Sequence, residues 1–354
     1  MPTPLRFALM GSGRISERHA RVLKESGFGR LVGVCDLRPE RSEAVGKRFE
    51  VPSFDDWRPM VEKTRPDVVT ILTPSGLHAE NVIELAGKVP SLVVEKPMAL
   101  RLEDADRMIV ACDTNRTRLF VVKQNRCNVA VRKLREAVEA NRFGKMVLGT
   151  VRVRWCRTQH YYDQDAWRGT WALDGGVLAN QASHHIDLLE WMLGEPESVF
   201  CRNATRLVDI EADDTAVAVV RFTSGALGII EATTATRPRD VEGSLSILGE
   251  RGMVEIGGFA VNEMKTWQFQ DAVPGDETIM QTARENPPDV YGFGHSEYLR
   301  GVVDAIENDS HALVDGVEGR RSLELISALY ESAETGQPVT LRFQPQRCRL
   351  GERQ

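Results

Sequence analysis

The sequence lacks several features that would each point to a different class of protein. Its 354 residues include six cysteines with no CxxC pair among them, which fits reduced thiols in a cytosolic protein. No hydrophobic run approaches the length of a membrane span. The formal net charge is −6, so broad binding to nucleic acid is not favoured.

The N-terminus also lacks the basic, apolar and small-residue sections of a signal peptide, and it passes directly into a strand. We therefore expect a cytoplasmic protein without a membrane or nucleic-acid partner. Hydrophobic content of 42% and charged content of 27% are ordinary for a soluble chain. The length suggests two domains with an ample core.

The first residues carry the pattern of a dinucleotide-binding turn. A buried strand over 5–10 is followed by Gly11 and Gly13 and then by a helical stretch. Gly11 permits a tight turn, and Gly13 lets the backbone approach a pyrophosphate. The helix N-terminus at Arg14 and Ile15 presents N–H groups and a positive dipole end to that anion.

Asp36 ends the next predicted strand and completes this pattern. It follows the turn by about 20 residues, where an acid binds the ribose 2′-hydroxyl. Its charge would repel a 2′-phosphate, so we expect NAD and not NADP, and Arg38 is too isolated to reverse this preference. Ser16 stands where a third glycine or alanine is usual, which is a small steric departure.

The pattern of apolar residues changes near the end of the first third of the chain. Short apolar runs alternate with helical stretches up to residue 122, as in a parallel, doubly wound sheet, whereas residues 147–155 alternate with period two. We expect an α/β fold with a Rossmann domain over 1–122, a C-terminal α+β domain with a large, mainly antiparallel open sheet over 123–343, and a polar tail over 344–354. Because open sheets of this kind pair with a copy, we expect a homotetramer or homodimer.

Two loops follow predicted parallel strands at their carboxyl ends, where α/β folds bind ligands. The first contains Thr73, Pro74 and His78, and the second is Glu95-Lys96-Pro97. We expect both loops to contact the cofactor. A single lysine beside a strand is usually a surface charge, but the position of Lys96 beside a nicotinamide-type site favours a functional role.

A second group of polar residues follows Gly175-Gly176 in a stretch that predicts a helix. In such a helix Asn180 and His184 share a face, Asp187 neighbours His184, and His185 points about 100° away. A histidine in an apolar helix is more often a packed core residue than a catalyst. The glycine pair, the amide and the acid around His184 favour general acid–base catalysis instead.

Taken together with Trp167-Arg168, these features resemble the Gfo/Idh/MocA superfamily, the relatives of glucose–fructose oxidoreductase and inositol dehydrogenase. The similarity covers nearly the whole chain. Within the superfamily the sequence most resembles the bacterial UDP-N-acetylglucosaminuronate 3-dehydrogenases. The matching strings are residues 121–126, 161–162, 167–171, 180–184 and 291–295.

The resemblance implies a two-domain NAD-dependent oxidoreductase with its active site between the domains. Lys96 would lie beside the reacting hydroxyl, before a cis peptide to Pro97, and His184 would be the acid–base. The implied reaction oxidises the C3 hydroxyl of UDP-N-acetylglucosaminuronic acid to a ketone, with NAD kept bound and recycled by 2-oxoglutarate. Many members carry Asp where this chain has Asn180, and an amide can orient the histidine ring without adding charge.

A nucleotide-sugar uronate carries a carboxylate and a diphosphate, so its site needs cations and amides. Trp167 and Arg168 would lie against the cofactor. Each substrate-binding candidate is equally compatible with a solvated or structural role. Besides Asn180 and His184, the candidates are Lys123, Asn125, Tyr161, Arg168 and His295.

Two other functions remain open from the sequence. One is another sugar or polyol dehydrogenase of the inositol type, and the other is a non-catalytic NAD-binding regulator. Retention of both Lys96 and His184 argues against the regulator, because a binding protein needs neither. No His, Cys or carboxylate cluster has metal-ligand spacing, so no metal is expected, and His19 is expected to pack on the first helix.

Overall fold

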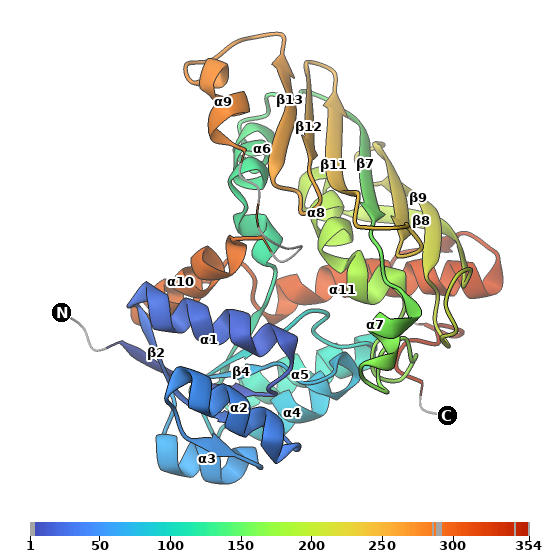
Figure 1. Ribbon diagram of the computed structural model, residues 1–354. Coiled ribbons are helices and arrows are strands. Elements are labelled where there is room, and N and C mark those ends of the chain that lie inside the picture. The colour runs from blue at the N-terminus through green and yellow to red at the C-terminus, as the bar shows by residue number, and fades with distance from the viewer. Residues whose placement is uncertain (1–3, 285–286, 288–291, 343–344, 353–354) are drawn as a thin grey trace. The chain divides into compact units, whose positions relative to one another are not determined.

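The computed structural model describes residues 4–284, 287, 292–342 and 345–352 (Figure 1). The chain forms two compact units, Met1–Lys123 with His295–Arg320 and Gln124–Gly294 with Arg321–Gln354. The structure thus differs from the predicted division, because residues 295–320 return to the first unit after the second has been built. Tyr291, in the last of the matching strings, lies outside the described residues.

The first unit contains a six-stranded parallel sheet in the order β3-β2-β1-β4-β5-β6, which confirms the doubly wound Rossmann fold (Figure 1). Every residue of β4 and β5 is buried, as expected for parallel strands covered on both faces. The strands are β1 (Leu5–Met10), β2 (Gly29–Cys35), β3 (Ser53–Phe54), β4 (Val68–Ile71), β5 (Ser91–Val94) and β6 (Arg118–Val121).

Helices connect these strands and pack against the sheet. They are α1 (Arg14–Ser26), α2 (Pro39–Phe49), α3 (Trp57–Thr64), the 3-10 turn η1 (Ser75–Leu77), α4 (His78–Leu85), α5 (Leu102–Thr114) and, much later, α10 (Gly294–Glu307). Arg118 at the start of β6 donates to the carbonyl of Ala305 at 2.6 Å, which ties α10 to this sheet. None of the described helices combines the length and hydropathy that a bilayer span requires.

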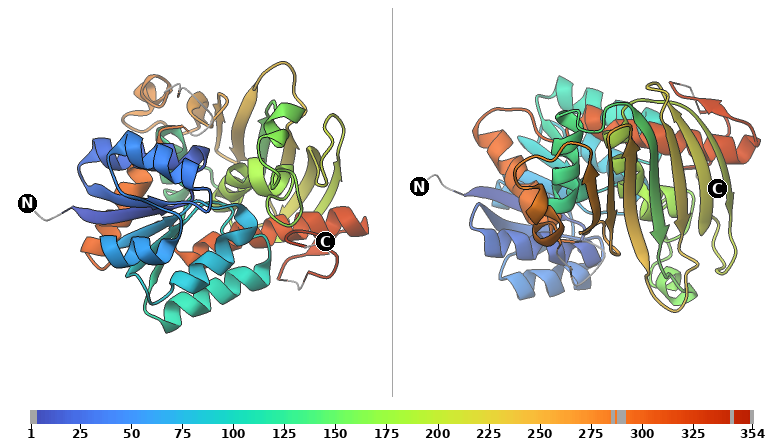
Figure 2. Two further views of the ribbon diagram at one scale, coloured as in Figure 1. Left: turned by 60° about the horizontal axis from the view of Figure 1, so that its bottom comes forward. Right: turned by 90° about the horizontal axis from the view of Figure 1, so that it is seen from above.

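The second unit contains an eight-stranded sheet in the order β13-β12-β11-β7-β10-β9-β8-β14 (Figure 2). Only β7 and β10 pair in parallel, so the predicted, mainly antiparallel sheet is confirmed. The strands are β7 (Met146–Arg154), β8 (Pro196–Ala204), β9 (Thr215–Phe222), β10 (Leu227–Thr233), β11 (Glu242–Gly249), β12 (Gly252–Gly257), β13 (Glu263–Phe269) and β14 (Val339–Thr340).

One face of this sheet is covered by helix α8, which contacts β7 and β11. The sheet buries alternate residues, so that Val151 and Val153 of β7 are each 1% exposed. The other segments are η2 (Gln124–Cys127), α6 (Val129–Glu139), α7 (Gln159–Asp163), η3 (Val177–Gln181), α8 (Ser183–Leu193), α9 (Asp276–Thr282) and α11 (Gly316–Thr335).

The C-terminal segment 344–354 was predicted to be a polar tail; its described part is mostly exposed but is anchored to the second unit. Leu350 is 2% exposed, and the N–H of Gly351 donates to the carbonyl of Trp171 at 2.8 Å. The N–H of Arg347 donates to the carboxylate of Glu331 on α11 at 2.7 Å. Buried Leu350 and these two anchored backbone N–H groups thus fix a polar segment that would otherwise fray.

An apolar patch lies on the exposed face of the large sheet. It consists of Val217 and Val219 on β9 with Leu227 and Ile229 on β10, each at least 40% exposed. Ile229 pairs directly with Val219 across the two strands, so their side chains are contiguous. Contiguous exposed apolar side chains favour association with another surface.

We predict that the full-length protein is a homotetramer or homodimer that uses this patch. The substitution Ile229→Asp should lower the mass measured by light scattering at micromolar concentration, because it places a charge in a dehydrated interface. Val110→Asp on α5, another exposed apolar position, serves as the control and should not change the mass. A monomeric mass for the unmodified protein would contradict the prediction.

Candidate active site

The turn after β1 has the geometry that the glycine pattern predicts. Gly11 has φ +101°, and a Cβ there would lie 2.7 Å from the backbone carbonyl of Leu72 at the end of β4. Its N–H donates to the carbonyl of Cys35 at 2.8 Å, so the turn is held between β4 and β2. Any larger residue would separate these strand ends.

Helix α1 begins directly after this turn. Gly13 is its N-cap and supplies no side-chain cap, and a Cβ at Gly13 would meet no described atom within 4 Å. Gly13 therefore borders open space at the positive end of the helix, which Arg14 and Ile15 begin, as a pyrophosphate requires. Ser16 is accommodated without strain, because its hydroxyl donates to the carbonyl of Gly13 at 2.6 Å.

Asp36 is directed at the same turn. One carboxylate oxygen accepts the N–H of Ser12 at 2.7 Å, and the other accepts the N–H of Arg38 at 2.9 Å. The side chain is half-buried at the carboxyl end of β2, next to the glycine turn. The position and negative charge of this carboxylate suit the hydroxyls of a ribose and oppose a 2′-phosphate. The residues of the turn therefore fit NAD.

His78 joins the two loops at the carboxyl ends of β4 and β5. Its Nε2 lies 2.8 Å from the carbonyl oxygen of Thr73, and its Nδ1 lies 2.8 Å from that of Pro97. Both ring nitrogens thus face backbone carbonyl oxygens and brace the two loops, and the predicted contact of His78 with the cofactor stays a prediction. Pro74 forms the N-cap of η1, and Thr73 also accepts the amide of Asn81 through its hydroxyl at 3.4 Å.

The Glu95-Lys96-Pro97 loop follows β5, and its Lys96–Pro97 peptide is cis, as the resemblance implied. Glu95 is 7% exposed. One carboxylate oxygen accepts the backbone N–H of Lys96 at 3.0 Å, and the other lies 2.9 Å from Nε2 of His19. The carboxylate therefore points into the unit and contacts the protein, and the predicted contact of Glu95 with the cofactor stays a prediction.

Two more of the histidines considered in the sequence lie at this loop, and the predicted binding of substrate by His295 stays a prediction. His295, predicted to bind substrate, belongs to the first unit, is 1% exposed and lies 3.8 Å from Glu95. His19 does more than pack on its helix, because it hydrogen-bonds Glu95. One side-chain nitrogen or oxygen from each of His19, Glu95 and His295 lies within 4.8 Å of the other two. The three residues are far apart in the sequence, so this cluster could not be predicted from it.

In the second unit the centre of the polar network is Asp174, which is 2% exposed. Its carboxylate accepts the N–H of Gly169 at 2.7 Å and the side-chain amide of Asn180. The amide oxygen of Asn180 accepts Nε2 of Gln181 at 2.9 Å. Asn180 is therefore held by Asp174 and Gln181, and the prediction that it orients His184 stays a prediction.

Trp167, Arg168 and Tyr161 form a compact group on one side of this network. The guanidinium of Arg168 lies over the rings of Tyr161 and Trp167, 4.4 and 4.7 Å from their centroids, and donates to the Tyr161 hydroxyl at 2.6 Å. Gln181 also donates to that hydroxyl at 3.3 Å. Arg157, which the sequence did not single out, donates to the side-chain oxygen of Gln181 at 3.2 Å and adds a second cation.

The predicted single helix after Gly176 is instead a π turn followed by α8. The N–H of Ala182 donates to the carbonyl of Val177 at 2.8 Å, which widens the turn by one residue. His184 lies in the first turn of α8 and is 6% exposed. The simple i, i+4 relation between Asn180 and His184 therefore does not hold.

Two further polar residues of α8, His185 and Asp187, have structural partners. His185 is fully buried with its ring edge-to-face against Trp155 at 5.6 Å, and burial lowers the pKa of His185 to about 3. Asp187, predicted to neighbour His184, accepts two hydrogen bonds from Arg126, each at 2.8 Å. Asp187 is thus the partner of a buried arginine.

Lys123 ends the N-terminal segment of the first unit, and Asn125 is the second residue of the second unit. Each is 3% exposed. The side-chain oxygen of Asn125 is buried and has no hydrogen-bond partner among the residues that the structure describes. A buried polar atom of this kind costs free energy unless a ligand or water satisfies it. Asn125 therefore remains a candidate for substrate binding.

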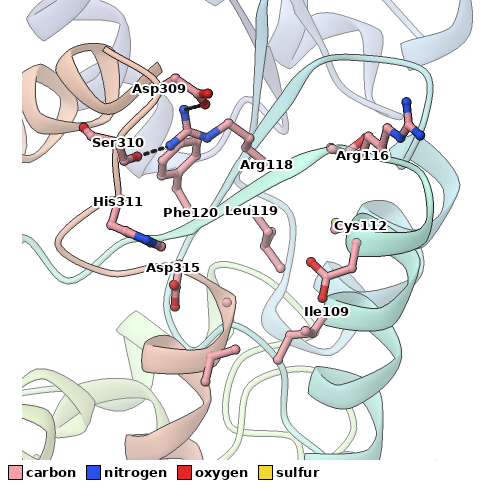
Figure 3. A pocket seen from close by; sticks show the side chains of 15 residues that line it. Ile109, Cys112, Arg116, Arg118, Leu119, Phe120, Asp309, Ser310, His311 and Asp315 are labelled. Atoms are coloured by element: carbon pink, nitrogen blue, oxygen red, sulfur yellow. Dashed lines mark hydrogen bonds and ion pairs between the residues drawn. The ribbon is translucent and has the colours of Figure 1, made fainter. Parts of the chain in front are cut away.

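A cavity of about 470 Å³ lies elsewhere in the first unit (Figure 3). It is lined by the end of α5, the start of β6 and the segment before α11, including Ile109, Arg116, Arg118 and His311. Arg118 lines the cavity and donates to the carbonyl of Ser310, another lining residue. Because the cavity lies at the amino end of β6, it is separate from the loops at the carboxyl ends of the strands.

Comparisons with known proteins decide the family. Residues 5–123 match the description "Oxidoreductase family, NAD-binding Rossmann fold", and residues 135–341 match "Oxidoreductase family, C-terminal alpha/beta domain". The chain belongs to the Gfo/Idh/MocA oxidoreductase family. It is therefore an NAD-dependent dehydrogenase, and NAD is its cofactor.

Several members of this family resemble the chain along nearly its whole length. The WlbA dehydrogenase from Bordetella pertussis, solved with NADH and UDP-GlcNAcA, is 41% identical, with a TM-score of 0.90 over 97% of this chain and 99% of that one. WlbA from Chromobacterium violaceum, with the same ligands, is also 41% identical, with a TM-score of 0.90 over 97% and 98%. Myo-inositol 2-dehydrogenase from Thermotoga maritima is 28% identical over 95% of this chain and 98% of its own.

We predict that Asp36 controls the choice of nicotinamide cofactor. The substitution Asp36→Asn keeps an oxygen for the N–H of Ser12 but removes the charge, so NADP binding should improve by about tenfold or more, equivalent to roughly 1.4 kcal/mol. NAD binding should weaken, because the ribose loses a charged acceptor. Calorimetric titration with both cofactors measures this, and tighter binding of NADP by the unmodified protein would contradict the assignment.

Proposed function

We propose that this chain oxidises the C3 hydroxyl of UDP-N-acetylglucosaminuronic acid to the 3-keto sugar nucleotide. The observation that carries the proposal is its 41% identity, over 97% of the chain, to a WlbA dehydrogenase solved with UDP-GlcNAcA. The polar groups of the second unit add support. Arg168, Tyr161 and Asn125 offer the cation, phenol and amide that an acidic nucleotide sugar needs.

The proposed chemistry divides between two side chains. Oxidation of a secondary alcohol removes the hydroxyl proton and the hydrogen on carbon as a hydride, and bound NAD supplies the hydride acceptor. His184 accepts the hydroxyl proton at a ring nitrogen, as a general base. Lys96 stabilises the negative charge that develops on the oxygen, and its position is set by the backbone hydrogen bond to Glu95.

The second unit holds its cationic and amide groups in a connected network. Asp174 holds Asn180, Asn180 holds Gln181, and Gln181 donates to Tyr161, which also receives the guanidinium of Arg168. Side chains whose positions are fixed before binding lose little conformational entropy when a ligand arrives. The network therefore favours recognition of a polar substrate by a preorganised surface.

An inositol-type substrate is the second candidate, because myo-inositol 2-dehydrogenase is 28% identical over 95% of the chain. Inositol carries no anionic group, so it offers no charged partner to Arg168 or to Arg157. A non-catalytic regulator remains the least favoured reading, because the chain has both Lys96 and His184. The two dehydrogenase readings share the same catalytic residues and differ only in the substrate.

We predict that Lys96→Ala and His184→Ala each reduce kcat by about 10²–10⁴-fold, the range for loss of a general base or an electrostatic contact. NAD affinity, measured by calorimetry, should change little, because both side chains act on the substrate hydroxyl. The rate is followed as the absorbance of reduced nicotinamide in a single turnover, so that slow release of NADH does not obscure the chemical step.

His185→Ala is the matched control for His184→Ala. It removes a neutral core side chain from Trp155, so it should lower the free energy of unfolding by about 1–3 kcal/mol without abolishing turnover by the folded protein. If His185 proved essential and His184 dispensable, the assignment of the base would be wrong.

We predict turnover with UDP-N-acetylglucosaminuronic acid and much slower turnover with UDP-N-acetylglucosamine, which lacks the carboxylate. Loss of one buried charge contact costs about 2 kcal/mol or more, or about 30-fold in kcat/KM. Free inositol and glucose serve as further substrates in the same assay. Faster reduction of NAD by either of them would remove the nucleotide-sugar assignment and leave the general dehydrogenase reading.

A further inference from the structure

Three side chains from distant parts of the sequence meet inside the first unit. His19 comes from α1, Glu95 follows β5, and His295 is the second residue of α10. They are 0%, 7% and 1% exposed. The Nε2 atoms of His19 and His295 lie 2.9 and 3.8 Å from the same carboxylate oxygen of Glu95, and the two rings are edge-to-face with centroids 5.3 Å apart.

Glu95 is a carboxylate in this arrangement. Burial alone would raise its pKa, but the hydrogen bond from His19 and the nearby ring of His295 outweigh burial and hold the pKa of Glu95 well below its ordinary value. An ionised carboxylate only accepts hydrogen bonds, so the Nε2–H of His19 is the donor. The two rings thus keep a negative charge inside the unit.

The second oxygen of Glu95 acts on the next residue. It accepts the backbone N–H of Lys96 at 3.0 Å, and one residue further the carbonyl of Pro97 lies 2.8 Å from the ring of His78. The backbone N–H of Lys96 and the carbonyl of Pro97 therefore both contact buried side chains. The lysine itself is half-buried between these two anchors.

The distances favour a hydrogen-bonded cluster over a metal site. When two ligand atoms each lie 2.0–2.1 Å from a tetrahedral zinc ion, they are about 3.3 Å from each other. Nε2 of His19 and the nearer carboxylate oxygen of Glu95 are 2.9 Å apart, which is the length of a hydrogen bond. A structural zinc site also needs four ligands, and the grouping supplies three among the described residues. One oxygen of Glu95 is already used by the backbone of Lys96.

We infer that His19 and His295 are positioning residues for the dehydrogenase, which act on Lys96 through Glu95. They hold the Glu95 carboxylate where it fixes the Lys96 peptide, and so they set where the lysine ammonium meets the substrate hydroxyl. This inference rests on the proposed catalytic role of Lys96. Because His19 lies on the helix that begins at the dinucleotide turn, the same contact links that turn to the lysine.

The expected size of the effect follows from the geometry. A displacement of about 1 Å at a reacting group can cost about 10²-fold in rate. His19→Ala and His295→Ala should therefore lower kcat with UDP-N-acetylglucosaminuronic acid by about 10–10²-fold. KM and NAD affinity should change much less, because neither ring faces the glycine turn or Asp36. His19→Gln should restore most of kcat, since its amide can donate to the same oxygen.

A second measurement is independent of catalysis. The exchange rate of the Lys96 backbone N–H with deuterium, read by mass spectrometry on the full-length protein, reports its hydrogen bond to Glu95. His19→Ala and Glu95→Gln should raise this rate, and His19→Gln should not. His311→Gln, an exposed histidine of the same unit, is the matched control and should leave exchange and kcat unchanged.

The outcomes separate this inference from the proposed function. Unchanged exchange and kcat in the alanine variants would overturn it, as would one retained zinc per chain in elemental analysis or a loss confined to NAD affinity. If Lys96→Ala keeps full turnover while exchange responds as expected, the cluster positions the peptide, but the catalytic role of Lys96 fails. If the alanine variants do not fold, Glu95→Gln, which keeps the side-chain volume, carries the same two measurements, and unchanged values overturn the inference.

Discussion

The close approach of Gly11 to the end of β4 is the contact on which the candidate site of the first unit depends. A Cβ at this position would lie 2.7 Å from the carbonyl of Leu72, so only glycine lets the chain turn here. The turn starts α1 at the carboxyl end of β1. The N-terminal N–H groups of α1 can therefore face an anion. The same helix carries His19 to Glu95, so one close backbone contact positions both the glycine turn and the histidine that meets Glu95.

Much of the first unit could be predicted because its signals are local. A strand, a glycine turn, a helix and Asp36 follow one another within a short stretch, and buried apolar runs mark the remaining strands. The partners of buried polar groups could not be predicted, because no periodicity states which carboxylate a histidine such as His19 or His295 will meet. The return of α10 to the first unit was missed for the same reason, since it depends on contacts such as Arg118 to Ala305.

The second unit shows how tertiary contacts change a local prediction. An apolar stretch with helical spacing predicts one continuous helix, but a Cβ at Gly176 would lie 1.8 Å from a carboxylate oxygen of Asp213. The chain therefore enters the helix against Asp213, and Asn180 bonds back to Asp174 six residues earlier. The hydrogen bond from Ala182 to Val177 widens this turn into a π turn. Such turns are frequent at functional sites, but their cause lies outside the segment that forms them.

The same network explains why an amide stands at position 180. Asp174 is 2% exposed, and its carboxylate accepts both the amide of Asn180 and the N–H of Gly169. An aspartate at position 180 would bring two carboxylates into contact in a buried place, where one of them would have to stay protonated. The amide avoids this repulsion and donates to Asp174, while its oxygen accepts Gln181. Negative charge beside Asn180 is thus supplied by Asp174, through this hydrogen bond.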